Sequence, residues 1–435
     1  MPEGTDLSSP EVPFLRLIPI LLWSLAALPV WAAPKAPKDP AAPQPKLIQG
    51  EGLAVEEFDD GSYVLRSASV RGDMLRAEVE VDTAQGTLRP SLYPRHLKSV
   101  APFSDELGRG QMLTVTHTGL AGTPDLICEY RVYANRPWGD IRVTVRNSTV
   151  SSIEVHSIHV AKSKPGTVAD LNGPARQDLV LSDRYSEDIP YIRMLGEGNE
   201  PGGGHLAFGS QLIYNRQSGQ SLFLAALSAD RMLTVFHLAS SGSYDIEDSG
   251  TNEALKEQQQ AYPAANTVPF TLQIPAGESL SSERLMFAAG SDYHAQLESY
   301  GQAIRILHKA MVSTPPLMGW WSWTAYYYGV TENTVLTNAA WLAQNLEPLG
   351  YRYFQVDEGY QYARGEYATP DGKAFPHGMA RVAHQVEDRG ITFGLWVAPF
   401  EVSERSWVYE HHRVRTPSSI SAERPIRFTG RDMSG

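Results

Sequence analysis

The stretch YFQVDEGY, residues 353–360, ends an apolar run in two adjacent acidic residues, Asp357 and Glu358. A short apolar run with such a boundary is typical of a buried strand in a parallel sheet. Neighbouring side chains of a strand point to opposite faces, so the two carboxylates can converge only where the strand ends. Gly359 permits the turn that this convergence requires. The sequence therefore predicts an acidic pair at the C-terminal end of a strand.

On both sides of this stretch, apolar runs alternate with segments of helical periodicity. The predicted strands are 317–323, 351–357 and 392–400, and the predicted helices are 331–346, with Thr331 as N-cap, and 377–390. Such alternation indicates βαβ units and a parallel sheet. Three units in order fit either an open doubly wound sheet or the start of a (β/α)8 barrel. No Gly-x-Gly-x-x-Gly follows the first strand, which disfavours a dinucleotide-binding fold.

Polar and aromatic residues stand near the C-terminal ends of these strands, and the candidate binding residues among them are Trp321, Trp323, Asp357, Glu358, Tyr360 and Trp396. In a barrel, the active site is built at this face. Adjacent carboxylates approach a ligand from one side, whereas the nucleophile and acid of a retaining glycosidase flank the bond that is cleaved. We therefore expect the acidic pair to accept hydrogen bonds from neighbouring sugar hydroxyls. The alternative is a solvated acidic turn.

Trp320, Trp321 and Trp323 cannot all face one way on a strand, so at least one of them is expected to belong to the core. On a strand over 317–323, Trp321 and Trp323 would share one face and Trp320 would take the opposite one. Trp341 falls on the apolar stripe of the helix 331–346, which predicts a buried side chain.

The preceding part of the chain has a different pattern. Residues 47–290 contain many short runs of alternating apolar and polar residues, separated by Gly, Asn and Pro, as in DIRVTVRNSTVSSIEVHSIHV at 140–160. This pattern predicts an antiparallel β-sandwich. Residues 291–314 follow with helical spacing and are predicted to form a linker helix.

Composition narrows the classes of partner and cofactor. A net charge of −12 argues against nucleic acid, because binding a phosphate backbone requires positive charge. The single cysteine, Cys128, excludes an internal disulfide and a cysteine-based zinc site. No metal site and no cofactor are predicted.

The N-terminal residues predict export. Residues 1–32 contain the apolar run LIPILLWSLAALPVWAA after Arg16 and are typical of a secretory signal peptide. Residues 33–46 form a Pro/Ala-rich linker. A secreted or periplasmic protein is expected, without stable membrane insertion once the signal peptide is cleaved.

Three motifs resemble the clan D glycoside hydrolases, the retaining α-galactosidases and α-N-acetylgalactosaminidases of families 27 and 36. They are PPLMGWWSW, YRYFQVDEGYQ and FPHGMARVAHQVEDRGITFGLWVAPF, and they come in the order of those families. The β-rich segment ahead of the motifs resembles family 36. The resemblance implies that residues 315–412 are the first three βα units of an incomplete (β/α)8 barrel.

The resemblance also implies a function, the hydrolysis of terminal α-linked galactose with retention. By family, Asp357 and Glu358 hydrogen-bond galactose hydroxyls, and Trp321, Trp323 and Trp396 line the pocket. Two residues depart from the usual pattern: Glu358 stands where Asp is usual, and Trp321 where Asn or a smaller residue is usual. Both reshape the pocket, which puts strict galactose selectivity in question. A carbohydrate is the expected partner, and the sequence leaves open whether the chain forms a homo-oligomer.

The family nucleophile, in a Lys-x-Asp motif after the fourth strand, and the acid/base after the sixth have no counterpart in this sequence, so no catalytic residue is assigned. Residues 413–435 form an atypical tail rich in Arg, Ser and Thr, which suggests a truncated or frame-shifted gene product. As written, the chain is expected to be inactive. Two alternatives stay open: a related α-glycosidase or glycosyl transferase with another sugar selectivity, and a non-catalytic carbohydrate-binding protein.

Overall fold

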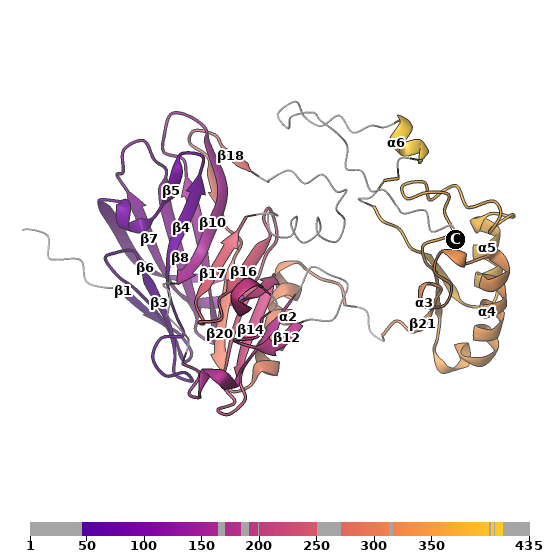
Figure 1. Cartoon of the computed structure of the whole chain (residues 1–435), viewed down its shortest axis with the longest axis horizontal. Helices are drawn as coiled ribbons and strands as arrows, with labels where there is room; N and C mark the ends of the chain where they lie inside the picture. The colour runs from indigo at the N-terminus through magenta and orange to yellow at the C-terminus, as the bar shows by residue number, and fades with distance from the viewer. Residues whose placement is uncertain are drawn as a thin grey trace, which may run out of the picture. The chain divides into compact units, whose positions relative to one another are not determined.

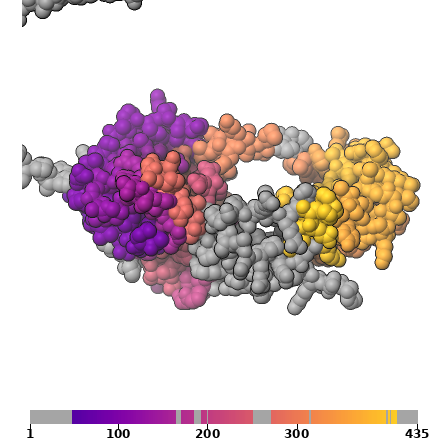
Figure 2. All heavy atoms as spheres, turned by 90° about the horizontal axis from the view of Figure 1, so that it is seen from above, coloured from indigo at the N-terminus to yellow at the C-terminus, as the bar shows by residue number. Residues whose placement is uncertain are grey.

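The structure is a computed structural model, and it describes residues 46–163, 170–183, 191–198, 200–249, 271–312, 316–399, 402–403 and 405–411 (Figure 1). Figure 2 shows the atoms of the chain as spheres, coloured by residue number. The predicted signal peptide, most of the Pro/Ala-rich linker and the atypical tail lie outside the described residues. Within the described residues, no helix is long and apolar enough to span a membrane.

Antiparallel strands dominate the described residues between 46 and 290, and they form two sheets. The first sheet has the order β1-β2-β3-β4-β10-β17-β16-β13, with β18 paired to β10 and β5 to β4. Its strands are β1 (Lys46–Gln49), β2 (Leu53–Glu57), β3 (Tyr63–Ser67), β4 (Leu75–Thr83), β5 (Gly86–Leu88), β10 (Ile153–Ser163), β13 (His205–Phe208), β16 (Thr234–Leu238), β17 (Tyr244–Asp248) and β18 (Leu272–Ile274).

The second sheet has the order β12-β11-β14-β15-β20-β9-β8-β7-β6, with β19 paired to β9. Its strands are β6 (Arg95–Asp105), β7 (Gly108–Thr118), β8 (Asp125–Tyr133), β9 (Trp138–Arg146), β11 (Asp178–Ser182), β12 (Tyr191–Met194), β14 (Ser210–Asn215), β15 (Ser221–Ala226), β19 (Ser279–Ser281) and β20 (Leu285–Gly290). The predicted antiparallel strands are confirmed. The run at 140–160 divides between the sheets, because β9 belongs to the second and β10 to the first.

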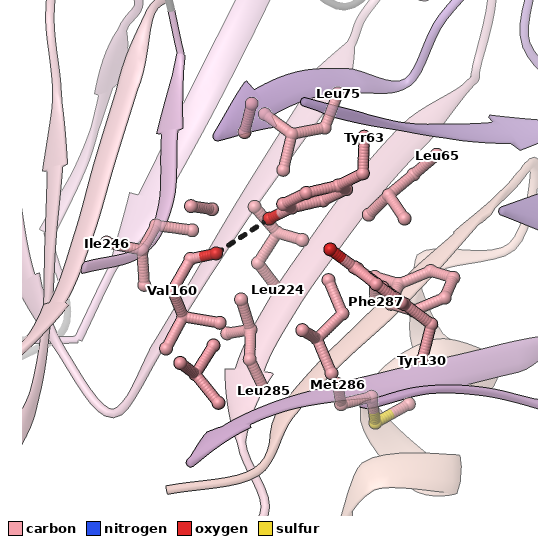
Figure 3. Close-up of a cluster of buried hydrophobic side chains, with 14 of the residues drawn as sticks. Tyr63, Leu65, Leu75, Tyr130, Val160, Leu224, Ile246, Leu285, Met286 and Phe287 are labelled. Carbon is pink, nitrogen blue, oxygen red and sulfur yellow. Dashed lines mark hydrogen bonds between the residues drawn. The ribbon is translucent and has the colours of Figure 1, made fainter. Parts of the chain in front are cut away.

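Alternation along most of these strands places one set of side chains in a hydrophobic core that both sheets share. Figure 3 shows part of this core. The rings of Tyr63 on β3 and Tyr130 on β8 lie 5.1 Å apart, so residues of the two sheets meet directly. The Tyr63 hydroxyl donates to the Val160 carbonyl at 2.9 Å, which satisfies a fully buried polar group.

A charged network connects three neighbouring strands of the first sheet through the buried side chain of His159 on β10. Its Nδ1 lies 2.6 Å from Asp245 on β17, and its Nε2 lies 3.2 Å from Asp82 on β4 and 3.6 Å from Glu247. Burial alone would lower the pKa of His159, but the hydrogen bond and charge of Asp245, together with the charge of Glu247, raise it above its ordinary value. The surrounding carboxylates therefore favour the protonated imidazole, and Ser157 Oγ lies 3.1 Å from its Nε2.

His159 predicts a pH-dependent stability. Because the pKa is raised on folding, the stabilisation is fully present below the unfolded value near 6.5 and is lost as the pH rises through the folded value. We expect His159→Gln to cost about 2 kcal/mol at pH 5.5, the size of a charge-assisted hydrogen bond, and clearly less at pH 8.5. Urea unfolding at both pH values measures this. His156→Gln, at a partly exposed position on the same strand, is the control, and an equal cost at both pH values would contradict the assignment.

Helical segments of the described chain follow and interrupt the sheets. The 3-10 helices are η1 (Pro90–Leu92), η2 (Ala175–Gln177), η3 (Pro201–Gly203), η4 (Tyr327–Gly329) and η5 (Glu347–Leu349), and the α-helices are α2 (Tyr293–Leu307), α3 (Trp323–Tyr326), α4 (Glu332–Asn345), α5 (Met379–Glu387) and α6 (Trp407–His411). Helix α2 falls within the predicted linker helix. Asp292 caps it by accepting from the Ala295 backbone N–H at 3.0 Å.

Residues 316–399 contain a three-stranded parallel sheet in the order β21-β22-β23. The strands are β21 (Gly319–Trp321), β22 (Tyr353–Val356) and β23 (Thr392–Leu395). Helices α4 and α5 bury one face of the sheet, where Phe354 and Val356 share a core with Val335 and Val382. Thr331 caps α4 as predicted, because its Oγ1 accepts from the Thr334 backbone N–H at 3.3 Å.

Three sequence predictions in this region are wrong, and one of them is the third strand, which ends at Leu395 and does not continue to residue 400. The first strand is shorter than 317–323: it ends at Trp321, and Trp323 begins the helical turn α3, so Trp321 and Trp323 do not share a strand face. Trp341 is 57% exposed, not buried, because the face of α4 that meets the sheet carries Ala339 and Leu342. Trp320 is half-buried and packs against the core, stacked on Phe354 with the ring centroids 4.2 Å apart.

Candidate functional site

Asp357 lies immediately after β22, at the C-terminal end of the parallel sheet, and its side chain is buried. Its Oδ1 accepts from the Glu358 backbone N–H at 2.9 Å, and its Oδ2 accepts from Gln355 Nε2 at 2.8 Å. Its own backbone N–H donates to Ser322 Oγ at 2.8 Å. The first two hydrogen bonds use, among the described contacts, one acceptor position of each carboxylate oxygen, and the third holds the backbone of Asp357 at the strand end.

Glu358 is also buried, but protein donors surround its carboxylate. Oε1 accepts from Arg364 Nε at 2.6 Å and from Gln361 Nε2 at 3.3 Å. Oε2 accepts from Arg364 Nη2 at 2.8 Å and from the Tyr328 hydroxyl at 3.2 Å. Partial burial and the charge of Glu358 raise the pKa of Tyr328, which keeps this phenol protonated as a donor. The two acids therefore sit side by side in different environments.

Arg364 connects the acidic pair to the end of the next strand. Its guanidinium binds Glu358 through two nitrogens and lies over the ring of Trp396, 5.6 Å from the ring centroid. Trp396 directly follows β23, and its backbone N–H donates to the Val356 carbonyl at 3.0 Å. The ladder thus places Trp396 beside the end of β22, where the acids lie.

Tyr360 has no exposed surface, and its ring belongs to the core between the sheet and the helices. Burial, with the neighbouring Tyr367, raises the pKa of Tyr360 to about 12, and the hydroxyl donates to the Trp396 carbonyl at 3.0 Å. The sequence predicts that Tyr360 binds substrate, whereas in this structure its side chain has no exposed surface and its hydroxyl supports the backbone of Trp396.

The two tryptophans of the first unit flank the acids in different ways. Trp321 is 51% exposed and lies opposite Gln355 in the ladder, so both side chains project from the sheet face that α4 and α5 leave uncovered. Trp323 is half-buried and contacts the rings of Tyr327 and Tyr328 edge-on, each at 5.2 Å. Through Tyr328, Trp323 is connected to Glu358.

The turn after the acids depends on Gly359. Its φ is +116°, a conformation that L side chains rarely adopt, and a Cβ there would stand 2.8 Å from Tyr328 Cα. The absence of a side chain therefore lets the backbone of Tyr328 approach the acidic pair.

The structure thus brings five of the six predicted residues to one end of the sheet and places the sixth, Tyr360, beneath them. Sequence reasoning missed Arg364, Gln361 and Tyr328. An arginine a few residues beyond two adjacent acids was the available signal for Arg364, because a buried carboxylate needs a cationic partner. Among the described residues, no group of three or more His, Cys, Asp or Glu side chains could hold a metal ion.

Comparisons with known proteins bear on the same region. Residues 293–430 match the Melibiase family model, a range that includes most of the predicted atypical tail. The predicted resemblance to α-galactosidase-like glycoside hydrolases is confirmed. The chain is 27% identical over 118 residues to probable α-galactosidase B of Emericella nidulans, and that alignment covers 26% of each chain. It is 21% identical over 333 residues to α-galactosidase 1 of Pediococcus pentosaceus, covering 72% of this chain and 42% of the relative.

Solved α-galactosidase structures share the fold over more of the chain. The α-galactosidase from Lactobacillus brevis matches with a TM-score of 0.55 at 14% identity, covering 85% of this chain and 56% of that one. A family 36 α-galactosidase from Geobacillus stearothermophilus matches with a TM-score of 0.52 at 14% identity, covering 85% and 58%. Variants of the latter enzyme have been solved with stachyose and with raffinose. The chain spans less than half the length of the two curated relatives named above.

Proposed function

We propose that residues 316–411 supply the sugar-binding part of an α-galactosidase-like site that takes the terminal α-linked galactose of an oligosaccharide. On this proposal the two antiparallel sheets form the β-sandwich of a family 36 enzyme, and the parallel sheet with its helices forms the first three units of a (β/α)8 barrel. The proposal depends above all on Asp357, a buried carboxylate fixed at the end of the middle strand. The α-galactosidase relatives and the stachyose and raffinose complexes of a structural neighbour support it.

The aromatic residues around Asp357 suit a sugar. Trp321 exposes half of its surface on the same sheet face as Gln355, and Trp396 follows the neighbouring strand. Apolar ring faces cover the C–H face of a pyranose, while a carboxylate accepts hydrogen bonds from its hydroxyls. Asp357 then orients the sugar, and the tryptophans bury it.

Hydrolysis of α-galactosides requires more than the binding of galactose. Retaining hydrolysis needs a nucleophilic carboxylate and an acid on opposite sides of the anomeric carbon, about 5–5.5 Å apart. Asp357 and Glu358 share one strand end and are assigned to binding. We therefore expect the 435-residue chain to bind galactose without hydrolysing α-galactosides. Export of the protein likewise stays a proposal that follows from residues 1–32.

Titration of the purified chain with galactose, followed by calorimetry, tests the function. We expect binding of galactose and at least tenfold weaker binding of glucose. The two sugars differ in the orientation of one hydroxyl, from which Asp357 would accept a hydrogen bond. Nitrophenyl α-galactoside is expected to release no nitrophenol. Equal affinity for both sugars would contradict galactose recognition, and turnover would contradict the assignment of the acids to binding alone.

One observation favours a second candidate. Glu358, which replaces the usual Asp, is engaged by four protein donors. A pocket with this change suits a related α-glycosidase or glycosyl transferase with another sugar preference. A panel of monosaccharides in the same titration separates the two candidates, since a second sugar that binds more tightly than galactose would favour the alternative.

A further inference from the structure

We infer that Glu358 and Arg364 form a positioning pair and that Asp357 is the carboxylate of the acidic pair that accepts hydrogen bonds from the sugar. The inference rests on the proposed function and assigns different roles to two residues that the sequence treats alike. It depends on how many acceptor positions each carboxylate has left once its protein partners are counted.

An ionised carboxylate offers about four lone-pair positions, two on each oxygen. Protein donors occupy two on Oε1 of Glu358 and two on Oε2, at distances from 2.6 to 3.3 Å. A sugar hydroxyl would have to displace one of these donors to reach Glu358. Displacing an Arg364 contact would separate a buried charge from its partner, which costs more than a hydroxyl contact contributes.

Asp357, unlike Glu358, has acceptor positions that the described protein donors do not occupy. Each of its oxygens accepts one described hydrogen bond, from the Glu358 backbone N–H and from Gln355. One acceptor position per oxygen therefore remains, which matches two hydroxyls on adjacent carbons of a sugar. Asp357 is thus the member of the pair with capacity for a ligand.

Arg364 gives the pair its positioning role. It holds Glu358 through a bidentate contact, whose planar geometry fixes the carboxylate more tightly than a single bond would. The same guanidinium lies over Trp396. The pair therefore sets the orientation of the Trp396 ring relative to Asp357, and it acts on a ligand through these neighbours.

A double-mutant cycle tests the inference, with the wild-type chain, Glu358→Met, Arg364→Met and the double variant. Each single variant removes the bidentate contact between Glu358 and Arg364, so we expect a lower melting temperature and about tenfold weaker galactose binding, the effect of one lost hydrogen bond to a charged group. In the double variant, two apolar chains of similar length replace the ion pair, and most of both losses is recovered. We expect the galactose affinity of the double variant to lie within about threefold of wild type.

Each result decides the inference. If Glu358 binds the sugar directly, the double variant binds as weakly as Glu358→Met, and the positioning role is overturned. Arg405→Met, which removes an exposed arginine that lies over Tyr362, is the matched control. If Arg364→Met does not fold, Arg364→Lys replaces it, since Lys keeps the charge but not the bidentate contact. If the wild-type chain binds no galactose, the proposed function fails, and the melting temperatures alone then decide: additive shifts overturn the pair and recovery in the double variant supports it.

Discussion

Asp357→Asn is expected to weaken galactose binding by the chain at least about a hundredfold, because two hydrogen bonds to a charged acceptor contribute about 1.5–3 kcal/mol each. The substitution removes the negative charge and turns one acceptor oxygen into a donor. Gln355 Nε2, which donates to Oδ2 at 2.8 Å, would then face an amide nitrogen or force the amide to flip. Either arrangement leaves at most one oxygen for the sugar.

Isothermal titration with galactose measures the effect, and unfolding in urea shows whether the variant folds. Asp388→Asn is the matched control, since Asp388 is an exposed residue at the C-terminal end of α5. We expect the control to bind like wild type. If Asp357→Asn kept wild-type affinity while Glu358→Met lost it, the roles of the two acids would be reversed.

The position of the acidic pair was predictable because it depends on local sequence alone. An apolar run that ends in charged residues must leave the core at that point, and the glycine that follows fixes the turn. The N-cap of α4 was predictable for the same reason, since Thr331 acts on a residue three positions away. In both cases the information lies within a few residues of the feature.

The contacts of Glu358 were not predictable in the same way. Arg364 reaches back to Glu358 across the loop after β22, and Tyr328 comes from a turn 30 residues earlier. Such contacts depend on the path of the loops, which periodicity does not describe. The sequence showed two equivalent acids, and only the side-chain partners separate their roles.

The errors on the tryptophans have a similar origin. Aromatic residues at 320, 321 and 323 favour a strand by propensity, but β21 pairs with only three residues of β22 and ends at Trp321. Trp341 precedes Leu342, which is buried against the sheet, and consecutive residues of a helix lie about 100° apart. A small difference in which face of α4 meets the sheet therefore decides whether Trp341 is buried.

Gly359→Ala is expected to destabilise the residues around the acidic pair by about 2 kcal/mol or more and to abolish galactose binding at the same time. The backbone of Gly359 has a φ of +116°, where a Cβ is strained whatever the surrounding space. Here the space is also closed, since the Cβ would stand 2.8 Å from Tyr328 Cα and 3.1 Å from the Tyr327 carbonyl oxygen. Backbone atoms cannot rotate away, so the turn itself must move.

Movement of this turn reaches both acids, because Gly359 directly follows Glu358 and the displaced Tyr328 is a donor to its carboxylate. Urea unfolding followed by tryptophan fluorescence gives the loss of stability, and titration gives the loss of binding. Gly372→Ala is the matched control, since a Cβ at Gly372 meets no atom within 4 Å. A Gly359→Ala variant with the stability and affinity of this control would show that the close approach of Tyr328 to the acids is not needed for the site.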